Sequence, residues 1–156
     1  MEEAVVEAVV LVSLIAIVTL IAGYFSSATY FLVKEVEYQD ANLVKGQILW
    51  GVGEACHYIF DVGGKPPAYN SASFTIHVTK RVTLLTRQGL IEINPGPRGP
   101  QTTITLEELA AACESASGIQ QVQVQIVPGE LQRGYSITVQ VQGDPTTGSL
   151  VIHVGG

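Results

Sequence analysis

The sequence is poor in charge, and the shortage is concentrated near its beginning. Charged residues make up 14% of the 156 residues, and no charged side chain occurs from Ala8 to Val33. A helix over that stretch would be about 39 Å long, which exceeds the roughly 30 Å of a bilayer hydrocarbon core. Its apolar residues cover every face. The segment is therefore predicted to be a helix buried on all sides, by lipid or by protein.

Basic residues are also few. The chain has eight lysines and arginines in total and a net charge of −6, and the basic residues are scattered along it. No basic patch with interleaved aromatic residues occurs, so a nucleic acid is not expected as a partner.

Cysteine is almost absent, and the two that occur, Cys56 and Cys113, form no CxxC motif. They are a candidate disulfide if the domain lies outside the cytosol, and two buried thiols if it does not. The sequence leaves both alternatives open.

Signatures of catalysis are missing as well. The sequence has no P-loop, no GxSxG, no GxGxxG after a strand and no haem attachment motif. His57 has only Cys56 beside it, whereas a metal site needs further ligands, and His77 and His153 fall at polar positions of alternating segments. We therefore expect no enzyme activity, no metal and no cofactor.

Helical character begins near Glu3 and extends to at least Phe31. Apolar residues between Leu43 and Phe60 recur every three or four positions, which suits a helix that continues to about residue 60. Three glycines weaken that prediction, and residues 31–39 suit a strand equally well. The predicted domains are a hydrophobic helix over 1–33, with the extension to about 60 left open, and an outer β-rich head over 34–156.

After the glycine and proline residues at 63–67, apolar residues recur at every second position. Alternation predicts strands at 73–78, 119–127, 135–143 and 149–156, and a hairpin over 82–94 that turns at Gln88-Gly89. A short helix follows the linker PGPRGP, with Thr105 as its N-cap, Glu108 completing a capping box and Gly118 ending it. The predicted fold class is α+β, with an antiparallel β-rich head for which a sandwich-like form is one alternative. The glutamine-rich outer faces carry no charge, so we expect neighbours to cover part of them.

Two simple interpretations of the apolar start are a signal peptide and a membrane anchor. A signal peptide needs a basic n-region, whereas Glu2 and Glu3 are acidic. A single-span anchor would place Lys34 and Lys45 in the cytoplasm by the positive-inside rule, together with the head.

The apolar helix from Val5 to about Phe31, followed by a β-rich region from Ser73 to Val154, resembles the type IV pilin superfamily, especially archaeal pilins and archaeal flagellins. In that family a prepilin peptidase removes a short basic leader, and the helix leaves the membrane to enter a filament core. The resemblance implies a structural subunit of an extracellular filament at the cell surface, with a role such as adhesion. Many bacterial members have a glutamate at the fifth mature position, where this chain has Val5, so the archaeal branch fits better.

The resemblance implies that the chain polymerises with itself, that it resides in the membrane before assembly, and that assembly machinery acts on it. The residues predicted to form the assembly surface are Val5, Glu7, Val9, Val12, Ala16, Leu20, Gly23 and Phe25. Two alternatives are a single-span accessory subunit of a membrane complex and a membrane-tethered binding module.

Overall fold

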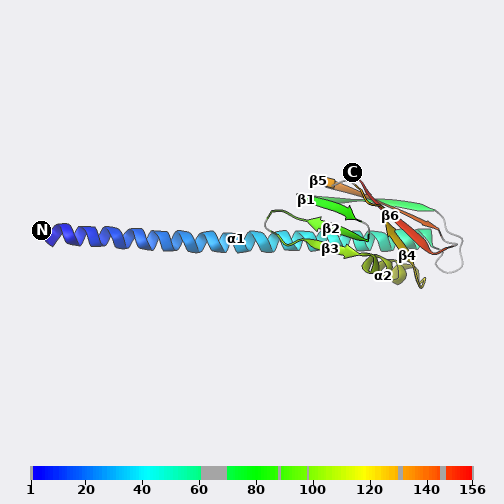
Figure 1. Cartoon of the computed structure of the whole chain (residues 1–156), viewed down its shortest axis with the longest axis horizontal. Coiled ribbons are helices and arrows are strands. Elements are labelled where there is room, and N and C mark those ends of the chain that lie inside the picture. The colour runs from blue at the N-terminus through cyan, green and yellow to red at the C-terminus, as the bar shows by residue number, and fades with distance from the viewer. Residues whose placement is uncertain are drawn as a thin grey trace.

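The computed structural model describes residues 2–60, 70–87, 89–97, 99–129, 132–144 and 147–155. Its elements, in chain order, are α1 (Glu2–Ile59), β1 (Ser71–Arg87), β2 (Leu90–Asn94), β3 (Thr102–Thr105), α2 (Leu106–Ser117), β4 (Gln123–Ile126), β5 (Gln132–Asp144) and β6 (Ser149–Gly155). A long helix projects from a head in which its second half is covered by strands and by α2 (Figure 1). This arrangement confirms the α+β fold class.

α1 is one uninterrupted helix of 58 residues, about 87 Å long by the usual rise per residue. No proline precedes Pro66, so nothing in this part of the chain removes a helical amide donor. The hydroxyl groups of Ser13, Thr19 and Thr29 each donate to the carbonyl oxygen four residues earlier, at 2.7–2.8 Å. These three hydroxyl groups of the apolar segment are thus satisfied by the helix itself.

α1 does not end at residue 33, where the first predicted domain ends. It continues to Ile59, which agrees with the alternative in which the helix extends to about residue 60. The strand alternative for residues 31–39 is not adopted, because extending an existing helix adds a hydrogen bond for each residue without a new nucleation step. Within α1, burial against the rest of the chain begins at Glu37. The loop after β2 meets the helix there, since a Cβ atom on Gly96 or Gly99 would collide with the Glu37 side chain.

The described strands form one six-stranded sheet in the order β3-β2-β1-β5-β6-β4. Neighbouring strands are antiparallel except β4 and β6, which are parallel, so the sheet is mixed. Alternation did not reveal this exception because it reports which face of a strand is buried and not its direction. The sandwich-like alternative needs a second sheet. In the part of the chain that the structure describes, α1 and α2 supply that second layer instead.

The predicted hairpin is confirmed in β1 and β2, which pair from Thr83 with Asn94 to Arg87 with Leu90. Gly89 has a φ of 94°, a conformation that costs glycine little. The predicted turn residue Gln88 lies outside the described residues. Sequence reasoning missed β3, which pairs with β2 immediately after the proline-rich linker.

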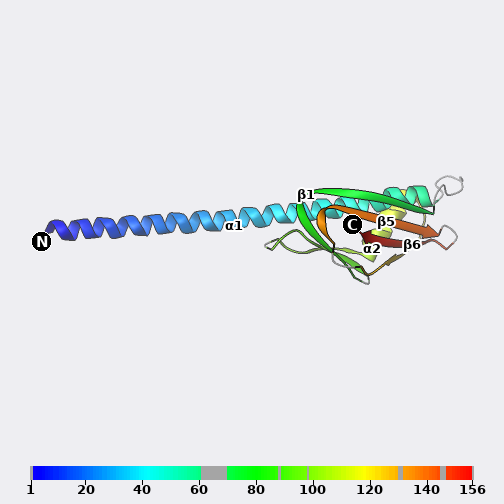
Figure 2. The same cartoon turned by 90° about the horizontal axis from the view of Figure 1, so that it is seen from above.

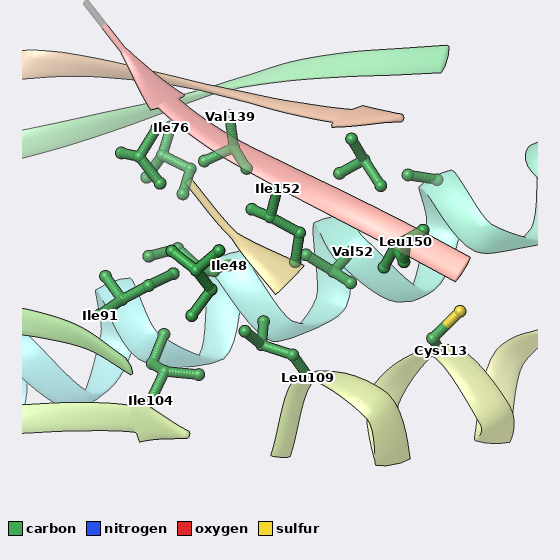
Figure 3. Close-up of a cluster of buried hydrophobic side chains, with 14 of the residues drawn as sticks. Ile48, Val52, Ile76, Ile91, Ile104, Leu109, Cys113, Val139, Leu150 and Ile152 are labelled. Atoms are coloured by element: carbon green, nitrogen blue, oxygen red, sulfur yellow. The ribbon is translucent and has the colours of Figure 1, made fainter. Parts of the chain in front are cut away.

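The core lies between the inner face of the sheet and one face of α1. The face that α1 contributes consists of Ala41, Val44, Ile48, Val52, Ala55, Cys56 and Ile59. Figure 3 shows Ile48 and Val52 directed towards Val139, Leu150 and Ile152 of the sheet. Seen from above, β1, β5 and β6 run alongside the second half of α1 (Figure 2). Apart from Leu43, which is exposed, the apolar residues whose three- and four-residue spacing was noted in the sequence form the core-facing side of this helix.

α2 closes the core on the side opposite the sheet. Thr105 and Glu108 form the predicted capping box, and Gly118 ends the helix with a φ of 74°. Leu109 and Cys113 are buried against α1, and Cys113 is bonded to Cys56 with 5.4 Å between their Cα atoms. The disulfide joins α1 to α2. Of the two possibilities that the sequence left open, a disulfide or two free thiols, the structure has the disulfide.

A second link between α1 and its neighbours is polar. The Lys45 Nζ atom lies 2.5 Å from Glu108 Oε1 and donates to the Thr103 carbonyl oxygen at 2.9 Å. The hydrogen bond from Lys45, with a further one from the Thr105 backbone, holds the pKa of Glu108 below its usual value. This lysine therefore ties α1 to both β3 and α2.

Reduction of the disulfide is expected to lower the free energy of unfolding of the head by about 3–4 kcal/mol, because the bond closes a loop across 57 residues of sequence. The change is measured by denaturant unfolding of the full chain in detergent, followed by circular dichroism, with and without a reductant. The double variant Cys56→Ala/Cys113→Ala is the control, since the reductant has no bond to break in it. An unfolding midpoint that does not move on reduction of the wild-type chain contradicts this prediction.

Two glycines of α1 form a matched pair for a packing test. A Cβ atom at Gly51 would overlap the ring of Phe74, whereas one at Gly46 meets nothing within 4 Å. Gly51→Ala is expected to destabilise the head by about 1–3 kcal/mol through overpacking. Gly46→Ala is expected to stabilise it by up to about 1 kcal/mol through helix propensity. Thermal unfolding of the two variants in detergent measures both effects, and equal shifts of the same sign would exclude the packing explanation.

Candidate functional site: the exposed apolar stem

The most unusual surface of the molecule is the first part of α1, residues 6–33, which we call the stem. Its large apolar side chains point outwards around the whole helix, and Leu20 and Phe25 are 74% and 64% exposed. The exposed set is Val6, Val9, Val10, Leu11, Val12, Leu14, Ile15, Ile17, Val18, Leu20, Ile21, Tyr24, Phe25, Tyr30, Phe31 and Leu32. In both views the stem extends away from the head without another element beside it (Figure 1, Figure 2).

The length and composition of α1 suffice for a membrane crossing. Its most apolar window of 18 residues has a mean hydropathy of 2.6, and none of that window is buried inside the protein. Contiguous exposed apolar patches on monomeric soluble proteins rarely exceed a few hundred Å². The stem is therefore a surface that lipid or other protein chains must cover, since each large side chain gains roughly 1.5–3 kcal/mol on burial.

Aromatic side chains gather towards the head end of the stem. Tyr24 and Phe25 form one edge-to-face pair, and Tyr30 and Phe31 form another. Lys34 and Glu35 follow them directly. Aromatic rings next to the first charges are typical of the boundary between hydrocarbon and water.

The residues predicted for assembly all belong to α1, but the chain does not gather them into one site. Glu7, Val9, Val12, Ala16, Leu20, Gly23 and Phe25 are all exposed. Val9, Val12, Ala16, Leu20 and Gly23 recur every three or four residues and so share one side of the helix, whereas Glu7 and Phe25 lie on the opposite side. No atom outside the local helix comes within 4 Å of the place where a Cβ atom of Gly23 would stand. The side chain of Val5 lies outside the described residues. These positions make a site only if several chains or lipids surround the stem.

Sequence reasoning missed a groove at the base of the stem. The groove has a volume of about 540 Å³ and is lined by Phe31, Leu32, Lys34, Glu35, Tyr38 and Pro100. Pro100 belongs to the loop between β2 and β3, so only folding brings it beside the helix. No local pattern in the sequence signals this contact.

The histidine and cysteine side chains singled out in the sequence lie apart from any cluster of metal ligands among the described residues. Among those residues, no three histidine, cysteine, aspartate or glutamate side chains are placed to hold a metal ion. His57 and His77 are exposed, and His153 is half-buried on the outer face of the sheet. Cys56 and Cys113 are held in the disulfide.

The outer face of the sheet is polar and largely uncharged. Gln123, Gln125, Gln140 and Gln142 are exposed on β4 and β5, as the alternation predicted. The hydroxyl groups of Thr75 and Thr138 form a hydrogen bond of 3.3 Å across β1 and β5. What covers these faces is not determined by the fold of a single chain.

Comparison with known proteins finds no family model, no curated protein and no solved structure that matches this chain.

A charge introduced in the stem is expected to weaken membrane association and to leave the stability of the head unchanged. Leu20→Asp should reduce membrane insertion, because aspartate at a helix centre costs about 3 kcal/mol on an insertion scale. The head should unfold at the same temperature, since its core contains no stem residue. Fractionation of membranes with carbonate extraction and thermal unfolding of the detergent-extracted chain measure the two properties.

The matched control is Leu20→Ile, which keeps the apolar volume and should remain in the membrane. A large fall in the unfolding temperature of the aspartate variant would contradict the independence of head and stem.

Proposed function

We propose that this protein is a structural, non-catalytic subunit of an extracellular helical filament, held in the membrane before assembly and polymerised through its stem. The observation that carries the proposal is the stem itself, which exposes apolar side chains on every face beside a stably packed head. Such a surface matches the centre of a helical bundle, where each helix is surrounded by others. The resemblance to archaeal pilins and archaeal flagellins points to the same role.

The disulfide supports a head outside the cytosol. Cys56 and Cys113 are fully buried and bonded, and structural disulfides persist in oxidising compartments. A plain anchor oriented by Lys34 and Lys45 would place the head in the reducing cytosol instead. The covalent link between α1 and α2 therefore favours an external head over that orientation.

Association of the stems must come from close packing, because lipid already satisfies apolar side chains. Small residues allow helix backbones to approach one another in such surroundings. The stem has them at Ala8, Ser13, Ala16, Ala22 and Gly23. A contact between different faces of successive copies does not close and so generates a helical polymer.

The test is negative-stain electron microscopy of material sheared from cells, with mass spectrometry to identify its components. We expect uniform filaments in which this chain is the dominant component. Recovery of the chain only in detergent extracts, together with other subunits, would instead establish a single-span accessory subunit. A membrane-tethered binding module would be found as single copies without filaments.

One stem variant distinguishes assembly from membrane anchoring. Gly23→Leu is expected to stay in the membrane, because it adds apolar surface and meets nothing in its own chain. It should yield several-fold fewer filaments, because the added side chain holds neighbouring helices apart. Leu20→Ile is the control that should assemble normally, and filament yields that are equal for the two variants would argue against packing at Gly23.

A further inference from the structure

We propose that the assembly contact continues beyond the stem, along a stripe of α1 that ends at Trp50, and that α1 of a second copy of this chain covers this stripe. This inference rests on the proposed function and names a surface of the head that the filament would use. We call the stripe the seam and define it by Leu32, Val36, Gln39, Leu43, Gly46 and Trp50.

The seam lies on the side of α1 that the head leaves uncovered. Leu43 and Trp50 are 61% and 70% exposed, although they lie within the part of the helix that packs on the sheet. Their neighbours Val44, Ile48 and Val52 face the core and are almost completely buried. In the head, α1 therefore has large apolar side chains on two sides, and among the described residues only one of these sides packs against other elements.

The spacing of the seam is that of a helix-to-helix contact. Successive members are separated by four, three, four, three and four residues, the alternation of a heptad repeat in which each pair of steps spans seven residues. Apolar residues at this period form a stripe along which a second helix can pack in a left-handed supercoil. Only Gln39 is polar, and Gly46 has open space where a side chain would stand.

The same register continues back into the stem through Thr29, Phe25, Ala22 and Val18. The surface is therefore unbroken from the region proposed for assembly into the head. It ends after Trp50, because the next position in the register, Gly53, packs against the Ala112 carbonyl oxygen of α2. The fold of the head sets the end of the seam.

Lipid does not account for the part of the seam that lies beyond Lys34. Trp50 lies about 24 Å along the helix beyond Lys34, the first charge after the stem. A bilayer whose hydrocarbon region of about 30 Å surrounds the uncharged residues 8–33 leaves Trp50 well outside. Whatever buries Trp50 in an assembly is therefore protein. A partner that follows the whole register must be a long helix with an apolar surface, and α1 itself has these properties.

Trp50 is the only tryptophan in the chain, so its intrinsic fluorescence reports on this surface alone. The experiment compares the detergent-extracted full chain with assembled filaments, by emission spectrum and by iodide quenching. We expect the emission maximum to move to shorter wavelength and the quenching constant to fall several-fold on assembly. Filaments in which Trp50 remains as accessible to iodide as in detergent would overturn the seam but leave the filament proposal standing.

A relocated reporter provides the matched control. The double variant Trp50→Phe/Tyr58→Trp moves the tryptophan to a position that is 53% exposed on the same helix but outside the seam. Its fluorescence is expected to change much less on assembly. Equal protection of both reporters would show general shielding of the head and would overturn a contact specific to the seam.

Substitution tests whether the contact contributes to assembly. Trp50→Ala should give several-fold fewer filaments, Trp50→Phe should retain them, and neither should change the unfolding temperature in detergent, because the side chain is largely exposed. Normal assembly of the alanine variant would overturn the proposal. Failure of the wild-type chain to form filaments would overturn both this inference and the proposed function, and protection of Trp50 by a different polypeptide would assign the seam to another occupant.

Discussion

One continuous helix has to satisfy two environments, and the rest of the structure depends on how it does so. The first part of α1 is apolar on every face, and the other described parts of the chain do not cover it. The second part is apolar on a face that the head buries, with polar residues interspersed. Because α1 runs from the stem into the head without a break, no loop separates the two parts.

The head is attached to this helix by apolar, covalent and ionic contacts. The sheet packs on one side of α1 through apolar contacts, and α2 packs on another through the Cys56–Cys113 disulfide and the Lys45–Glu108 ion pair. A domain this small buries a limited core, so a covalent link between its two helices is a substantial part of its stability. Gly51 allows the Phe74 ring to lie directly against the helix backbone. These contacts all lie beyond the stem, so the head is stable whether the stem is in lipid or among other helices.

This separation suits a subunit that changes its surroundings during its lifetime. A protein that leaves a membrane for a polymer must exchange lipid for protein around its apolar segment without unfolding. In the proposed filament this exchange would involve side chains that make no contribution to the head core. The proposed seam would extend the contact between neighbouring copies from the stem to the head. Packing along a periodic stripe also restricts register, which apolar character all round cannot do by itself.

Much of the local structure was predictable from local pattern. The apolar helix, the hairpin with Gly89, and the capping box of Thr105 and Glu108 all follow from interactions between residues near one another in sequence. For the same reason the alternation of β4, β5 and β6 correctly assigned their inward and outward faces. The parallel direction of β4, the strand β3 and the single mixed sheet were not predictable, because pairing partners are chosen by contacts distant in sequence.

The candidate site divides in the same way. The sequence by itself determined that residues 8–33 form a helix needing a partner on every side, because no charge or proline interrupts the apolar run. Only the tertiary structure decided which face of residues 37–59 the head covers, and so which residues remain exposed in the seam. It also decided that Cys56 meets Cys113 and that Pro100 reaches the base of the stem. Those outcomes depend on where the sheet and α2 pack on the helix, and helical periodicity alone does not distinguish one apolar face from another.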